Sequence, residues 1–204
     1  NVKVVHTFVL DWREDVSDIR RDLSIANYQY TDTKKSLWVA GASDTDESAA
    51  EKDADPTKAQ KNKQNYTPAK WDIQKYVTTN SFINNDKSNV NWYFLRYADV
   101  LLLYAESLNE WKHAEAYNAI NAVRRRGYGN PSNTSACDLP QGLDETSFRE
   151  AVRKERSYEL SFEGHRRQDL IRWGIYYKTV QATAKELGYW WEGTGSPNYS
   201  VATY

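Results

Sequence analysis

The chain has 204 residues, a formal net charge of −1 and 27% charged residues, so its charge balance favours neither nucleic acid nor an anionic membrane as a partner. A single cysteine, Cys137, excludes both an internal disulfide and a paired-thiol metal site. No apolar run reaches the roughly 20 residues that a membrane-spanning helix needs. The 8 Trp and 15 Tyr stand against 5 Phe, and aromatic side chains with a polar group suit wet interfaces and ligand platforms.

Residues 1–90 are predicted to form a small portion of strands and loops. Residues 2–10 are rich in β-branched side chains and residues 22–30 alternate in part, so both segments are predicted to be strands. The charged stretch between them, from Asp11 to Asp22, is predicted to be a charge-paired turn. Residues 42–65 are polar and predict a solvated loop, and residues 65–78 predict an extended segment.

Residues 92–109 are predicted to form the central helix of the fold. The apolar positions that recur at steps of three and four are Phe94, Ala98, Leu101, Ala105 and Leu108. Further apolar residues surround most of the helix, which is typical of a helix that is buried on all sides. Because an unpaired buried ion is strongly unfavourable, we expect Arg96 to bind carboxylates of the third helix.

Three more helices are predicted after the central one. The second spans about residues 116–126 and ends in three arginines, interpreted as cations at the negative helix end with Gly127 as a left-handed cap. An anion site at these arginines is the alternative. A capping box from Ser147 to Glu150 begins the third helix, and a short helical turn at 169–174 precedes the fourth, at about 175–187. The first two helices have the pattern of one tetratricopeptide-type unit, whose apolar face other helices must cover.

Glu155 and Glu159 are the closest approach to a catalytic pair in this sequence. They lie four residues apart on the apolar side of the third helix, and two carboxylates at about 5–5.5 Å could serve a glycoside hydrolase. The arginines expected near them are Arg96, Arg153, Arg156, Arg166 and Arg172. Guanidinium groups keep carboxylates ionised, which favours a structural role over acid catalysis. A glycosidase that uses Glu155 and Glu159 stays as an alternative.

No other pattern points to a reaction. The sequence contains no His-Glu-x-x-His motif, glycine-rich phosphate loop or nucleophile elbow. A Glu-x-x-His pattern at Glu110 and His113 occurs once, whereas a di-iron site needs two copies. The sequence therefore predicts no catalytic residue, no metal site and no cofactor.

Aromatic residues outside the predicted helices are candidates for a ligand platform. Flat rings can stack on sugars while nearby polar groups bind the hydroxyls. The candidate ligand-binding residues are Trp38, Tyr66, Trp71, Trp190 and Trp191. Packing is the competing role for each of them. If all of them only pack, the alternative is a helical-repeat adaptor that binds proteins and has no affinity for glycans.

Four stretches together resemble the SusD/RagB family of Bacteroidetes. They are Arg96 to Asn109 (RYADVLLLYAESLN), Ala119-Ile-Asn-x-Val-Arg-x-Arg126, Phe148 to Arg166, and Asp169-Leu-x-Arg-Trp-Gly174. The upstream residues Asp18-x-Arg20-Arg-Asp22 and Lys75-Tyr76 also resemble the pattern of that family. The similarity covers roughly residues 18–175 and resembles the C-terminal part of such a protein. We therefore expect residues 1–204 to be one C-terminal region, with a strand and loop portion (1–90), a helical portion (91–188) and a tail (189–204).

The resemblance implies a mostly α, tetratricopeptide-like fold with a small β and loop portion. It also implies a non-catalytic outer-membrane lipoprotein that takes part in nutrient uptake and polysaccharide utilisation. Such a protein binds oligosaccharides on the extracellular face and delivers them to a SusC-like TonB-dependent transporter, held by an N-terminal lipid anchor that this chain lacks. The motif residues Arg96, Glu155, Arg156, Glu159, Glu163 and Arg166 would then be scaffold. No ligand-binding residue is carried over by motif.

Overall fold

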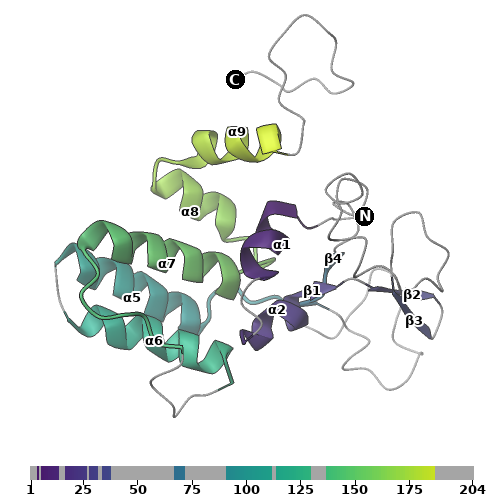
Figure 1. Cartoon of the computed structure of the whole chain (residues 1–204), viewed down its shortest axis with the longest axis horizontal. Helices are drawn as coiled ribbons and strands as arrows, with labels where there is room; N and C mark the ends of the chain where they lie inside the picture. The colour runs from purple at the N-terminus through teal and green to yellow at the C-terminus, as the bar shows by residue number, and fades with distance from the viewer. Residues whose placement is uncertain are drawn as a thin grey trace, which may run out of the picture. The chain divides into compact units, whose positions relative to one another are not determined.

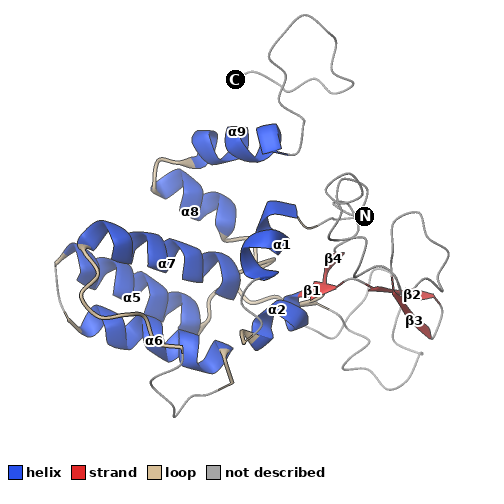
Figure 2. Ribbon diagram, viewed as in Figure 1, coloured by secondary structure: helices blue, strands red, loops and turns tan. Residues whose placement is uncertain are grey.

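The computed structural model describes residues 4, 6–13, 17–26, 28–31, 34–37, 67–71, 91–111, 114–129 and 137–186. The predicted loop at 42–65 and the tail at 189–204 lie outside these residues. The chain divides into two compact units, residues 1–166 and 167–204. The described part is mostly helical (Figure 2), as predicted, and none of its helices is long and apolar enough to cross a membrane.

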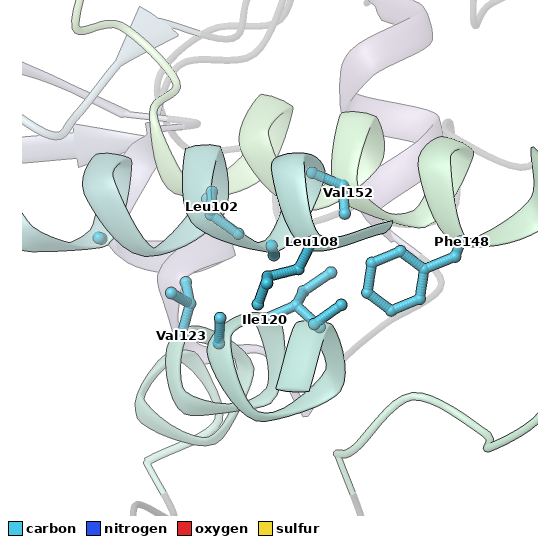
Figure 3. Close-up of a cluster of buried hydrophobic side chains, with 10 residues drawn as sticks. Leu102, Leu108, Ile120, Val123, Phe148 and Val152 are labelled. Atoms are coloured by element: carbon cyan, nitrogen blue, oxygen red, sulfur yellow. The ribbon is translucent and has the colours of Figure 1, made fainter. Parts of the chain in front are cut away.

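Three helices form the centre of the first unit. They are α5 (Tyr97–Glu110), α6 (Glu115–Gly127) and α7 (Glu145–Glu159), and they lie side by side (Figure 1). Leucine, isoleucine, valine and phenylalanine side chains from all three point into one core (Figure 3). Four buried alanines, Ala98, Ala105, Ala116 and Ala119, let α5 and α6 approach closely. The predicted helical hairpin is therefore present, and α7 packs against it.

The central helix is shorter and less buried than predicted. It begins at Tyr97, because Arg96 has an extended backbone (φ −140°, ψ 160°), so Phe94 lies outside the helix. Its apolar side chains Tyr97, Val100, Leu103 and Tyr104 are exposed. The prediction that this helix is buried on all sides was therefore wrong. The packed helices α6 and α7 cover one face only, and an all-round apolar composition does not reveal which face has a partner.

The N-terminal portion also differs from the prediction. Helix α1 (His6–Arg13) occupies the second half of the strand predicted for residues 2–10 and the start of the turn predicted from Asp11. Phe8 and Trp12, one helical turn apart, both pack against the ring of Tyr158 in α7, and Trp12 is fully buried. Tertiary packing at helical spacing overrides the β propensity of the valines here.

A second short helix and two strand pairs follow α1. Helix α2 (Ile19–Ser24) replaces part of the predicted turn, and the carboxylate of Asp18 caps it by accepting from the Arg20 backbone N at 3.0 Å. Strand β1 (Ile25–Ala26) pairs antiparallel with β4 (Thr67–Pro68), and β2 (Tyr28–Thr31) with β3 (Lys34–Leu37). The strand prediction for 22–30 was thus correct for its second half.

Two helix ends were assigned to the wrong residues. The N-cap of α7 is Asp144, whose side chain accepts from the Ser147 backbone N at 2.7 Å, so the capping box at Ser147 was wrong. Helix α6 includes Gly127, and the left-handed backbone is found two residues later, at Gly129 (φ +69°). The reason for a glycine at position 127 is a close approach of Arg20, described below.

The second unit contains most of α8 (Arg166–Arg172) and all of α9 (Tyr176–Glu186). Between them Gly174 has φ +69°, and its backbone N donates to Ile171 O at 2.9 Å. The predicted helical turn at 169–174 and the predicted fourth helix are both confirmed.

Candidate functional site

The C-terminal end of α7 is where distant segments of the chain meet. The last carbonyl groups of a helix have no partner within the helix and attract cations. Lys70 Nζ donates to Glu159 O at 2.7 Å and to Ser161 O at 3.3 Å, and Arg96 Nη2 also donates to Glu159 O. The segment after β4 and the segment before α5 are therefore both attached to this helix end.

Around this end lies a group of ionised side chains that we call the charged cluster. Its carboxylates are Asp18, Glu155, Glu159 and Glu163, and its cations are Arg20, Lys70, Arg96, Arg124 and Arg126. Its members come from α2, the segment after β4, the residue before α5, α6, and α7 with the loop that follows it. The cluster therefore connects most of the first unit.

Arg20 is the most connected cation of the cluster. Its Nε donates to Asp18 Oδ1 at 2.8 Å and its Nη2 to Asp18 Oδ2 at 2.6 Å, which is a bidentate pair. Its Nη1 donates to Glu155 Oε1 at 2.7 Å and to Glu159 Oε2 at 2.8 Å. The side chain also passes so close to the backbone of α6 that only glycine fits at Gly127, where a Cβ would lie 2.3 Å from Arg20 Nε.

The remaining contacts hold Glu155, Glu159 and Glu163 from the other side. Arg124 Nη1 donates to Glu155 Oε2 at 3.0 Å. Arg96 and Arg126 both donate to Glu159 Oε1, and Arg96 Nε donates to Glu163 Oε2 at 2.6 Å. Lys70 also pairs with Glu163.

Burial and these neighbours shift the pKa values of Glu159, Arg20 and Lys70. Burial alone would raise the pKa of Glu159, but Arg96, Arg126 and Arg20 outweigh it, and the net shift is downward. Burial likewise opposes the charge of Arg20, but Glu155, Asp18 and Glu159 raise its pKa above the ordinary value. Burial lowers the pKa of Lys70, although Glu163 opposes that shift. A lowered pKa at Glu159 is the opposite of what a general acid needs.

Only part of this arrangement was predicted. The pairing of Arg96 with a carboxylate of the third helix is confirmed at Glu159, and Arg96 also pairs with Glu163, which follows that helix. The other expected arginines lie elsewhere: Arg153 pairs with Glu150 at 2.6 Å, Arg156 with Asp99 at 2.7 Å and Arg172 with Asp169 at 2.9 Å, while Arg166 Nη1 donates to Arg153 O at 3.4 Å.

The cations that the prediction missed are Arg20, Lys70, Arg124 and Arg126. Arg20 lies in the stretch that was predicted to be a charge-paired turn, and Arg124 and Arg126 were interpreted as cations at a helix end. Sequence spacing gives no signal for contacts between residues as far apart as Arg20 and Glu159.

An aromatic group lies beside the cluster, and we call Trp71, Trp92 and Tyr93 the aromatic platform. The rings of Trp71 and Trp92 stack with centroids 4.7 Å apart and planes at 14°, and the ring of Tyr93 lies 5.8 Å from that of Trp71. Trp71 Nε1 donates to Phe162 O at 2.9 Å. Trp92 and Tyr93 are exposed and Trp71 is half-buried.

The platform contains one of the five predicted ligand-binding residues, Trp71. The other four, Trp38, Tyr66, Trp190 and Trp191, lie outside the described residues. Trp92 and Tyr93 were missed because they were counted as part of the central helix. A signal was available, since three neighbouring aromatics at 92–94 precede the Arg96 that starts the helical motif.

The platform and the charged cluster share one backing loop, residues 160–165. Phe162 has a left-handed backbone (φ +63°), which is uncommon for a residue with a side chain and persists only where the surroundings hold it. Lys70, Trp71 and Arg96 supply that hold through Ser161 O, Phe162 O and Glu163. Trp92 Cζ2 lies against Gly164, 3.7 Å from where a Cβ would be.

Comparison with known proteins places this arrangement in context. The sequence matches the SusD family over residues 10–194. A crystal structure of a SusD homolog from Bacteroides thetaiotaomicron VPI-5482 is 98% identical, with a TM-score of 0.84, over 98% of this chain and 38% of that chain. The SusD-like proteins P25 and P2 of Formosa agariphila are 41% and 34% identical over 53% and 44% of this chain. These two alignments span 19% and 18% of the length of the relatives.

Proposed function

The chain belongs to the SusD family, and from this membership we propose that it binds oligosaccharides on the cell surface without catalysing their cleavage. In this proposal it delivers them to a TonB-dependent transporter of the SusC type, at the extracellular face of the outer membrane, as part of a lipid-anchored protein. Family membership is the observation that carries the proposal. The exposed aromatic platform supports it, because Trp92 and Tyr93 offer ring surface to solvent.

We propose that sugars stack on the platform formed by Trp71, Trp92 and Tyr93. The predicted contacts of Trp38, Tyr66, Trp190 and Trp191 remain part of the same proposal. Calorimetric titration of the 204-residue chain with a panel of oligosaccharides tests it. Trp92→Ala should weaken binding by about tenfold, because a stacked ring is removed.

Trp111→Ala is the matched control for this experiment. Trp111 is also an exposed tryptophan, and it follows the C-terminal end of α5, whereas Trp92 precedes its N-terminal end. The 14 residues of α5 span about 21 Å at 1.5 Å per residue. Its removal should leave the affinity unchanged. Absence of binding to every oligosaccharide, or equal losses in the two variants, would count against the platform.

The exposed apolar face of α5 supports the transporter as a partner. Tyr97, Val100, Leu103 and Tyr104 lie on it, and contiguous exposed apolar surface is typical of protein interaction sites. Val100→Asp should therefore weaken binding of the chain to a purified SusC-type transporter. Val180→Asp in α9 is the control, since the two valines are 44% and 46% exposed. Equal binding by both variants would exclude this face.

The glycosidase alternative is tested by the same sugars. We expect no release of reducing sugar from any oligosaccharide on the panel, because both carboxylates of the pair are occupied by arginines. Hydrolysis by the wild-type chain that Glu155→Gln abolishes would overturn the non-catalytic proposal.

A further inference from the structure

The charges of the charged cluster are sorted by depth. The four carboxylate side chains are 1–2% exposed, whereas Lys70 is 25% and Arg126 55% exposed. Arg96 and Arg124 lie in between, at 22% and 20%. Solvent at this surface therefore meets cations and not the carboxylates that pair with them, so the cluster favours an anion outside it.

Arg126 is the most exposed of these cations, and it has donors to spare. A guanidinium has five N–H donors, and within the described part of the chain Arg126 uses one nitrogen, Nη2, in its contact with Glu159. Arg20 and Arg96 each use all three nitrogens on the cluster. The edge of the Arg126 guanidinium is thus available for a bidentate contact with a carboxylate or a sulfate.

Arg126 is linked to the aromatic platform through a short series of contacts. It shares Glu159 Oε1 with Arg96, and Arg96 also holds Glu163. The next residue, Gly164, is the one that Trp92 lies against. The stacking surface therefore lies against the backing loop, and Arg126 is connected to that loop through Glu159 and Arg96.

We propose that the ligands of this site are acidic oligosaccharides. One sugar ring stacks on the aromatic platform, and a carboxylate or sulfate group on a nearby sugar unit binds Arg126. The inference rests on the proposed function and narrows it to a ligand class.

Titration calorimetry with two matched pairs of probes tests the inference. One pair is hexagalacturonate and its full methyl ester, and the other is a κ-carrageenan hexaose and its desulfated form. The wild-type chain should bind at least one acidic probe about tenfold more tightly than its neutral counterpart, because a charge-assisted bidentate contact is gained. Added salt should weaken the binding of the acidic probe and leave the neutral one unaffected.

Arg126→Gln should abolish the preference for the acidic probe, and Arg125→Gln should keep it. The two variants change the net charge equally, but Arg125 is neutralised by Asp138, to which its Nε donates at 2.7 Å. Arg126→Lys keeps the positive charge but loses the two parallel N–H donors of the guanidinium. Its binding of the acidic probe should therefore still depend on salt but be weaker than that of the wild type. Thermal unfolding of each variant shows whether it is folded. If Arg126→Gln does not fold, the affinity of Arg126→Lys for the acidic probe tests the role of Arg126.

The outcomes separate the two proposals. Equal affinity for acidic and neutral probes, or an acidic preference that survives Arg126→Gln in a folded protein, overturns the inference and leaves oligosaccharide binding intact. Absence of binding to all four probes and to the wider panel overturns the proposed function itself.

Discussion

At the scale of single residues, Glu159 is the carboxylate of the charged cluster with the most arginine partners. Its two carboxylate oxygens accept from three arginines, Arg20, Arg96 and Arg126, and its backbone oxygen accepts from Lys70. A buried carboxylate with several charge-assisted hydrogen bonds is stable only as long as its partners remain, and its partners depend on it in the same way.

Glu159→Gln should lower the free energy of unfolding by about 3–5 kcal/mol, because it leaves the buried Arg20 with less compensating charge. Urea denaturation measures this. The control is Glu150→Gln, which breaks an exposed pair with Arg153 and should lower it by less than about 1 kcal/mol. An unchanged urea midpoint for Glu159→Gln would contradict the structural role of this residue.

Gly127→Ala should destabilise the protein although alanine is the better helix former by about 1 kcal/mol. The new Cβ would lie 2.4 Å from Arg20 Cζ, and Arg20 cannot move without leaving Asp18, Glu155 and Glu159. Net destabilisation of about 1–3 kcal/mol is expected in urea.

Asn118→Ala, at an exposed position of the same helix, is the control for Gly127→Ala. It should stabilise the protein by about half a kcal/mol. A gain in stability from Gly127→Ala as well would show that the contact with Arg20 is not tight.

The chemistry of these residues was predictable in part. Two carboxylates on the apolar side of one helix need either ionic partners or a raised pKa, and the arginines expected near them favoured a structural role for Glu155 and Glu159 over catalysis. Which cations pair with these two carboxylates depends on the tertiary fold, because Arg20 binds Glu155 although 135 residues of sequence separate them. Gly127 was predicted to be a left-handed helix cap, which was wrong. The sequence indicates where a helix ends, but it does not reveal that the side chain of Arg20 passes against that end.

At the scale of elements, α5 shows how a helix can be apolar all round and packed on one side. Leu102 is fully buried against α6 and α7, while its neighbour Leu103 is exposed. The helical periodicity alone does not separate them, because leucine occurs on both faces of α5 and the exposed face is also apolar, with Tyr97, Val100 and Tyr104. The positions of α6 and α7 decide which face becomes core.

The pair of neighbouring leucines gives a direct test of this packing. Leu102→Ala should lower the free energy of unfolding by about 2–5 kcal/mol, since it leaves a cavity in the core. Leu103→Ala should change it by less than about 1 kcal/mol. Urea denaturation compares the two, and similar losses would mean that α5 is covered on both faces.

Element types were predicted best where helical spacing continues over several turns, as in α5, α6, α7 and α9. They were predicted worst at the N-terminus, where α1 has the composition of a strand. There the stacking of Trp12 on Tyr158, with centroids 4.6 Å apart, and the hydrogen bond from Trp12 Nε1 to Asp18 Oδ2 at 3.1 Å decide the structure. Both contacts depend on the tertiary fold.

At the scale of the first unit as a whole, the charged cluster makes stability depend on acid. The pKa of Glu159 is lower in the folded state than its ordinary value. Its contribution is therefore complete above its unfolded pKa, about 4.3, and is lost as the pH falls through its lower folded value.

The free energy of unfolding of the wild-type chain should accordingly decrease as the pH falls below about 4.3. Urea denaturation across this range measures it. Glu159→Gln should show a weaker decrease, so that its deficit against the wild type shrinks in acid. Parallel curves for the two proteins would mean that the Glu159 carboxylate is not stabilised by folding.

Because Arg20 and its two α7 partners, Glu155 and Glu159, are far apart in the sequence of the first unit, their pairing has a consequence for the order of events during translation. Arg20 leaves the ribosome 135 residues ahead of Glu155, which at usual synthesis rates is on the order of ten seconds. Throughout that interval the nascent N-terminal segment has none of its α7 anchors, and its burial of Trp12 has to wait for Tyr158. Helix α7 is synthesised after α1 and α2, and it is the helix that supplies the packing partner of Trp12 and the ionic partners of Arg20.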